Sequence, residues 1–280
     1  MPISGAGRVA LAYTCANGTC RVFNTPHTIA NMTLPIAPPF FIALVFLGAA
    51  PFAESAPLAN EASIEVGAAQ YGYHEPNLGV ALQGFQAFVA GRYALGIDAN
   101  KHLVLDGRWT GGPLDYSSDT SGSNAGQPNY FLDVRGMLSL RSTAGFGFFD
   151  TYIGLGTRYL VNDAAGRFTS TGAYGYTRLS RYQYVPLGVT LHSHNNTLET
   201  NLELNVLIQG KQTSYLNNYT AQNPQNKGTG FRTSMLFKRD KWALGPYAHY
   251  WTVQDSEVDA LYYEPANTTT ELGVKLRYDF

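Results

Sequence analysis

The last fourteen residues, 267–280, read NTTTELGVKLRYDF, and this stretch decides the fold. From Thr270 to Phe280, every second residue is apolar, aromatic or threonine, and most of the residues between them are charged. A period of two is typical of a β-strand with one apolar and one polar face. By itself the stretch fits either an edge strand of a soluble sandwich or the closing strand of a transmembrane barrel. The choice depends on whether the pattern recurs.

The same period recurs in nine earlier segments, which turn residues separate from one another. The clearest is 130–141, where apolar residues alternate with residues that include Asp133 and Arg135. The ten predicted strands cover about 63–74, 80–95, 102–110, 130–141, 149–161, 174–191, 198–209, 231–237, 242–253 and 270–280.

The connectors between these segments alternate in length. Short ones follow the even-numbered segments, at 96–101, 142–146, 192–196 and 238–241. Long polar ones follow the odd-numbered segments after the first, at 111–128, 162–173, 213–228 and 254–267. Transmembrane barrels have short periplasmic turns and long outer loops, whereas a soluble sandwich has no reason to sort its loops. The sequence therefore predicts an all-β, ten-stranded antiparallel up-and-down transmembrane β-barrel over residues 62–280, in the bacterial outer membrane.

Composition excludes several other classes of protein. The net charge is −1, and no basic patch indicates a nucleic-acid partner. A mean hydropathy of −0.15 argues against a helical membrane bundle but not against a barrel, whose strands are half polar. Cys15 and Cys20 have no further cysteine or histidine pair nearby, so a four-ligand zinc site is not expected. We expect no metal and no cofactor.

The only long apolar run, APPFFIALVFLGAA at 37–50, precedes the predicted strands. Fourteen residues are too few to span a bilayer as a helix, which needs about 20. The run fits the apolar region of a signal peptide, predicted at 32–55 with cleavage after Ser55. Residues 1–31 are then an over-long start or a disordered leader. The alternative, a buried core helix, conflicts with Pro38, Pro39 and Pro51 at its ends.

Five stretches carry a family resemblance: YGYHEP (71–76), LVLDGRW (103–109), YIGLGTRYL (152–160), YQYVPLGV (182–189) and YEPANTTTELGVKLRYDF (263–280). They resemble a family of bacterial outer-membrane β-barrel proteins of about ten strands. The biochemical role of that family is unassigned, so the resemblance implies the fold and no catalytic residues.

The terminal strand also resembles the signal that the barrel-assembly machinery reads. The residues that carry it are Leu276, Tyr278 and Phe280. The expected partners are this machinery, outer-membrane lipid and lipopolysaccharide, with a monomer as the default state.

The inward phase of the strands is rich in charge of both signs. Buried charges must be paired, and a ten-stranded barrel is close to the size that side chains fill, so a salt-bridge and hydrogen-bond plug is the simplest interpretation. A narrow polar pore and a substrate-binding lumen are the alternatives. Gly154 and Gly156 are predicted to leave room for long side chains opposite. The predicted lumen network is Asp133, Arg135, Asp150, Arg158, Glu199, Glu203, His249, Glu271, Lys275 and Arg277.

Two enzymatic hypotheses and one binding hypothesis remain. Ten-stranded barrels include outer-membrane proteases of the omptin type, with acids and histidine at the outer rim, but here only His74 is predicted there. A lipid hydrolase could use His249 with Glu199 or Glu203, although such a triad needs a spatial adjacency that sequence does not show. Polar outer loops suit surface recognition. The sequence favours a structural or surface-recognition barrel over an enzyme.

Overall fold

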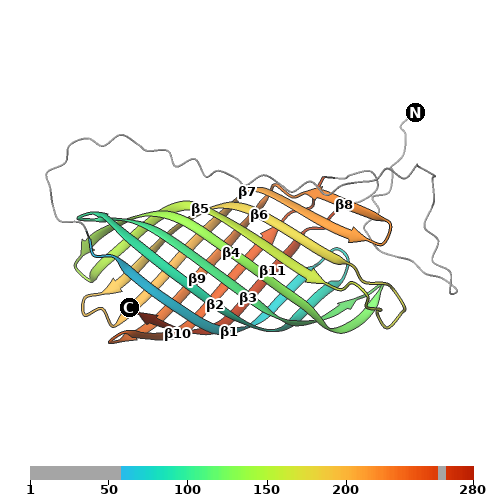
Figure 1. Ribbon diagram of the computed structural model, residues 1–280, viewed down its shortest axis with the longest axis horizontal. Coiled ribbons are helices and arrows are strands. Elements are labelled where there is room, and N and C mark those ends of the chain that lie inside the picture. The colour runs from blue at the N-terminus through green and yellow to red at the C-terminus, as the bar shows by residue number, and fades with distance from the viewer. Residues whose placement is uncertain (1–57, 258–262) are drawn as a thin grey trace.

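Strands make up most of the described part of the chain, residues 58–257 and 263–280 of a computed structural model (Figure 1). The predicted leader (1–31) and signal peptide (32–55) lie outside these ranges. No helix within them is long and apolar enough to cross a membrane. The strands are β1 (Glu61–Glu75), β2 (Val80–Asp98), β3 (Lys101–Ser118), β4 (Gly122–Ala144), β5 (Gly147–Asp163), β6 (Thr177–Ser193), β7 (Leu198–Leu216), β8 (Tyr219–Pro224), β9 (Gly228–Arg239), β10 (Trp242–Val253) and β11 (Asn267–Asp279).

These strands form one closed antiparallel ring. Each pairs with its sequence neighbours, except that β8 and β9 do not pair with each other. β1 pairs with β11 from Ser63 opposite Asp279 to His74 opposite Thr268. Because the seam between first and last strand is fully hydrogen bonded, the sheet has no open edge there.

β8 and β9 together make a single strand of the ring. Both pair with β7 in one continuous register, with Lys211 opposite Pro224 in β8 and Val206 opposite Thr229 in β9. The ladder is interrupted only around 225–227. The barrel therefore has ten strands, as predicted.

Two of the predicted long loops are mostly strand. The segment 111–128 continues β3 and β4 and leaves only 119–121 as a connector, and 213–228 contains the end of β7 and all of β8. The prediction of loops was wrong there because these strand ends lie beyond the apolar band. A strand end beyond the lipid needs no continuous apolar face, so its sequence need not alternate as a spanning strand does. The longest connectors are 164–176 and 254–266, at the same end of the barrel.

The outer face of the barrel carries a band of exposed apolar side chains. Phe85 is 74% exposed and Leu272 is 67% exposed. A continuous surface of such exposed apolar side chains is unfavourable in water. The band includes Phe85, Trp109, Leu132, Leu155, Leu187, Leu204, Phe231, Leu244, Leu272 and Val274. A closed antiparallel ring with this exterior is a transmembrane barrel of the bacterial outer-membrane type.

Glycines inside the barrel make room for aromatic rings. A Cβ atom at Gly156 would collide with the Tyr184 ring, and one at Gly188 would collide with the Tyr152 ring. Gly156 therefore leaves room for a long side chain, as expected. Gly154 is different, because a Cβ atom there would meet the backbone of Gly136 and Met137 on the neighbouring strand.

Candidate functional site

The lumen is the candidate site, and the structure places all ten of the predicted network residues on its wall. Seven of them are buried: Asp133, Asp150, Arg158, Glu199, Glu203, Glu271 and Arg277. The other three, Arg135, Lys275 and His249, are partly buried. Alternation along each strand brings these side chains inward. Their partners come from strands that are distant in sequence.

The inner end of the lumen holds bidentate ion pairs. Arg277 donates through Nη1 to Glu199 Oε1 at 2.6 Å and through Nη2 to Glu199 Oε2 at 2.7 Å. Arg141 donates to both oxygens of Asp150, at 2.8 and 3.0 Å. His192 lies beside this pair, with Nε2 3.2 Å from Asp150 Oδ2. Bidentate arginine–carboxylate pairs fix geometry as well as charge.

A second set of contacts lies deeper in the barrel, centred on Arg135. Its guanidinium donates to Asp106 Oδ1 and Oδ2 at 3.0 and 2.6 Å and also bonds Glu203. Tyr152 and Asn205 donate to the remaining acceptor positions of Glu203, at 2.9 and 3.0 Å. Each charge in this set therefore has a counter-charge in contact.

Above that set, Arg108 is the centre of a layer that crosses the lumen. It donates to Glu271 Oε2 at 2.6 Å and to the Tyr247 hydroxyl at 3.0 Å, and its guanidinium lies 4.0 Å from the centre of the Phe88 ring. Arg108 Nη1 is 2.8 Å from His249 Nδ1. Because a guanidinium can only donate, His249 accepts at Nδ1.

This geometry corrects the proposed catalytic pairing of His249. The sequence hypothesis put it with Glu199 or Glu203, but the carboxylate nearest to it in the structure is Glu271, with Oε1 3.7 Å from Nδ1. The acceptor nitrogen that a general base would use is already occupied by Arg108. His249 is thus part of a hydrogen-bond network with Arg108.

The same layer continues on the opposite wall through Asp133. Arg232 donates to Asp133 Oδ2 at 2.6 Å and to the Tyr184 hydroxyl at 3.0 Å, and that hydroxyl donates to Asp133 Oδ1 at 2.5 Å. Arg158 completes the layer, with its guanidinium 4.1 Å from the centre of the Phe131 ring. We call these residues the cross-lumen layer: Phe88, Arg108, Phe131, Asp133, Arg158, Tyr184, Arg232, Tyr247, His249 and Glu271.

The cross-lumen layer divides the empty space of the barrel. Below it are cavities of about 370 and 100 Å³, which share Arg92, Thr190, Glu199 and Arg277 as wall residues. Above it are cavities of about 30 and 410 Å³, which share Leu82, Asn162 and Arg178. No described residue lines both a lower and an upper cavity. We call the cavity of about 30 Å³ the upper cavity and that of about 410 Å³ the outer chamber.

A buried carboxyl pair lies where the upper cavity meets the outer chamber. Arg178 Nη1 donates to Glu75 Oε1 at 2.8 Å and to Glu264 Oε1 at 3.3 Å, and Tyr73 donates to Glu75 Oε1 at 2.6 Å. Burial raises the pKa of Glu264 to about 7, with Arg178 acting against the rise and Glu75 adding to it. Arg178 is thus in contact with both acids.

Several residues of the network escaped the sequence analysis. Asp106 and Arg108 lie on the inward phase of a predicted strand, so the signal was present. Arg232 lies on the inward phase of β9, but the predicted strand, 231–237, was shorter than the observed Gly228–Arg239. Glu264 lies in a connector, where no periodicity exists to reveal it.

The remaining sequence hypotheses concern the surface. His74 is exposed on the outward phase of β1, away from the lumen, so the described part of the outer mouth has no histidine of the omptin kind. Leu276, Tyr278 and Phe280 follow the outward phase of β11, and Tyr278 packs against Trp242 and Phe280 with ring centres 4.8 and 5.2 Å apart. Their role as an assembly signal stays a prediction.

Comparison with known proteins supports the fold. No family model and no curated protein matches the chain. Among solved structures, the outer membrane protease OmpT from Escherichia coli matches with a TM-score of 0.50 and 10% identity, covering 82% of this chain and 99% of that chain. At this identity the likeness shows the fold alone.

Two smaller barrels also match. The Neisserial surface protein A has a TM-score of 0.35 and 9% identity, over 80% of this chain and 100% of that chain. Ail, the attachment invasion locus protein of Yersinia pestis, has a TM-score of 0.31 and 11% identity, over 80% and 100%. At TM-scores this low, these two matches support no further argument about this protein.

Proposed function

We propose that this protein is a closed outer-membrane barrel that acts in recognition at its outer end and does not conduct solutes. The observation that carries the proposal is the cross-lumen layer, which separates the lower cavities from the upper ones. Its charges contact one another from opposite walls, as Arg108 does with Glu271 at 2.6 Å. Opening a path would leave buried charges without partners, which is strongly unfavourable.

The outer end has the features of a recognition surface. Strands β3, β4, β7 and β8 extend beyond the apolar band. The outer chamber is lined by the β1–β2 turn, the β3–β4 hairpin and the β5–β6 connector. Its volume of about 410 Å³ is within the range of small-molecule sites. Part of its wall is the β3–β4 hairpin, and a rigid sheet element positions binding groups more precisely than a loop does.

Planar-bilayer recording tests the closed state. Protein that has been verified as folded by its heat-dependent gel mobility is expected to give no regular conductance steps. Phe131→Ala removes a ring from the cross-lumen layer and is expected to introduce steps, whereas Phe148→Ala, at the inner cavity, is the matched control and is expected to remain silent. Regular steps from the wild-type protein would contradict the proposal and favour the narrow pore.

A further inference from the structure

In the upper cavity, the buried polar atoms that lack a hydrogen-bond partner are donors. Four buried side chains on its wall have a nitrogen with no hydrogen-bond partner: Asn129 Nδ2, Arg158 Nη2, Asn162 Nδ2 and Trp251 Nε1. Their side chains belong to residues that are 3%, 4%, 8% and 4% exposed. All four atoms are donors. Buried donors are normally satisfied, so a set of four around one cavity calls for an explanation.

The other polar groups of the cavity do not supply the missing acceptors. Ser180 donates to Gln212 Oε1 at 2.8 Å, and Tyr182 donates to Gln225 Oε1 at 3.1 Å. The amide nitrogen of Gln212 faces Glu264, so we leave it out of the set. Glu271 Oε1 is 3.7 Å from Arg158 Nη2, which is beyond hydrogen-bond range.

Water is a poor hydrogen-bond partner for a wall whose unpartnered polar atoms are all donors. Each water molecule brings two hydrogens of its own, which need acceptors that the four donors do not provide. A carboxylate brings only acceptors, with about four lone-pair positions on two oxygens. The positive charge of Arg158 further favours an anionic group over a neutral carbonyl.

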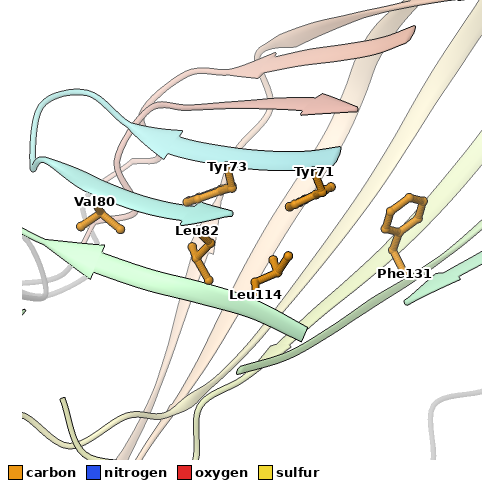
Figure 2. Packing of buried hydrophobic residues seen from close by; sticks show 6 residues of the cluster. All are labelled: Tyr71, Tyr73, Val80, Leu82, Leu114 and Phe131. Carbon is orange, nitrogen blue, oxygen red and sulfur yellow. The ribbon is translucent and has the colours of Figure 1, made fainter. Parts of the chain in front are cut away.

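The space above the cavity fits an apolar body attached to such a group. The upper cavity and the outer chamber share Leu82, Asn162 and Arg178, so a group in one reaches the other. Figure 2 shows Tyr71, Tyr73 and Leu114, which line the upper cavity, and Val80, which lines the outer chamber. Leu82, also labelled there, lines both. Aromatic and aliphatic walls with a few convergent polar groups are typical of small-molecule sites.

We propose that the barrel binds a small organic carboxylate with an apolar or aromatic body, which enters from the outer chamber. The four donors Asn129, Arg158, Asn162 and Trp251 hold the carboxylate in the upper cavity. This inference names a class of ligand for the proposed recognition role. It rests on that role in taking the outer chamber as the route of entry.

Benzoate is the probe that tests this inference, in chloride-free buffer with the full folded chain. We expect saturable quenching of Trp251 fluorescence and a shift of its indole N–H resonance. Trp109 and Trp242 are exposed on the outer face and are expected to change little. Benzyl alcohol, of similar shape but without the carboxylate, is expected to bind at least tenfold more weakly.

Isosteric variants locate the binding site. Asn162→Asp replaces a donor by an acceptor and is expected to weaken benzoate binding at least tenfold. Asn195→Asp makes the same change in an exposed inner turn and is expected to leave binding unchanged. If Asn162→Asp does not fold, the indole shift of Trp251 in the wild-type protein remains as the decisive measurement.

Three results would overturn the inference. They are the absence of saturable binding, equal affinity for benzyl alcohol, and displacement of benzoate by chloride at equal concentration, which would indicate a simple anion site. Conductance is measured separately, so its outcome tells the two proposals apart. Benzoate binding by a conducting protein would refute the closed barrel alone, and a silent protein without binding would refute only the carboxylate site.

Discussion

The cross-lumen layer and the upper cavity are neighbours built from the same kinds of residue, yet they differ in how their polar groups are matched. In the layer, Arg108 contacts an acid, a phenol and an imidazole. In the cavity, Asn129, Asn162 and Trp251 have donor nitrogens without a hydrogen-bond partner. Contacts between opposite charges stabilise one conformation of the layer, although Arg108 Nε and Arg232 Nε have no hydrogen-bond partner there. Donors without an acceptor, as in the cavity, add no such stabilisation until a ligand supplies one. Arg158 belongs to both, since its guanidinium packs on Phe131 in the layer while its Nη2 is one of the cavity donors.

The largest expected effect is the removal of an acid from the layer. Glu271→Ala leaves Arg108 and Arg158 with an uncompensated buried charge, which should cost about 3–5 kcal/mol of unfolding free energy. Urea unfolding from detergent micelles or vesicles measures it. Glu65→Ala is the control, since the pair that Glu65 forms with Lys275 is more exposed and should cost about 1 kcal/mol. Equal losses in the two variants would remove the distinction between the layer and its surroundings.

A smaller effect is expected from filling the space beside Tyr184. Gly156→Ala forces that ring out of its position, where its hydroxyl joins Asp133 and Arg232, and should destabilise the barrel by about 1–3 kcal/mol. Gly107→Ala is the matched control, because a Cβ atom there meets nothing within 4 Å. The same unfolding experiment compares them. A neutral Gly156→Ala would show that the layer can repack freely.

The smallest expected effect is a pH dependence at the outer mouth. Glu264 faces Arg178, Glu75, Tyr73 and Gln212, and its pKa in the folded protein is about 7, above the ordinary value of 4.5. Its neutral form is therefore favoured on folding, so its contribution is fully present below about pH 4.5 and is lost as the pH rises through 7. The mouth should become less stable over that range.

Hydrogen exchange of the Ser256 amide, which donates to the Glu264 carbonyl at 2.9 Å, reports this local stability. Once the intrinsic pH dependence of exchange is removed, protection should fall between pH 5 and about 7.5 in the wild-type protein. Glu264→Gln cannot ionise and should show a flat profile. An unchanged slope in that variant would assign the effect to another group.

The membrane-spanning part of the fold was predictable because lipid imposes a rule on it. Residues that touch lipid must be apolar, so β4 and β11 show strict alternation in the sequence. Above the lipid this rule ends, and the extensions of β3, β4, β7 and all of β8 therefore resembled loops. Their strand character comes from continued pairing with neighbours, which local sequence does not show.

The candidate site was predictable only as a set of inward-facing charges. Which charges meet depends on the stagger of the strands: Arg108 and Glu271 are 163 residues apart, and no local pattern links them. The donors of the upper cavity were harder still to find, because Asn129, Asn162 and Trp251 are neutral. Only their shared lack of acceptors distinguishes them, and that is a property of three-dimensional structure.

The seam between β1 and β11 has a consequence for how the chain could be rearranged. The Phe280 amide donates to the Ala62 carbonyl at 3.0 Å, so the end of the last strand lies beside the beginning of the first. A short peptide could join them, and new ends could open at an outer connector such as 119–121. Such a circular permutant keeps every ladder contact of Phe280 but moves this residue away from the C-terminus. It thereby tests the predicted assembly signal, which needs Phe280 at the terminus, separately from closure of the ring, which needs only the pairing of β11 with β1.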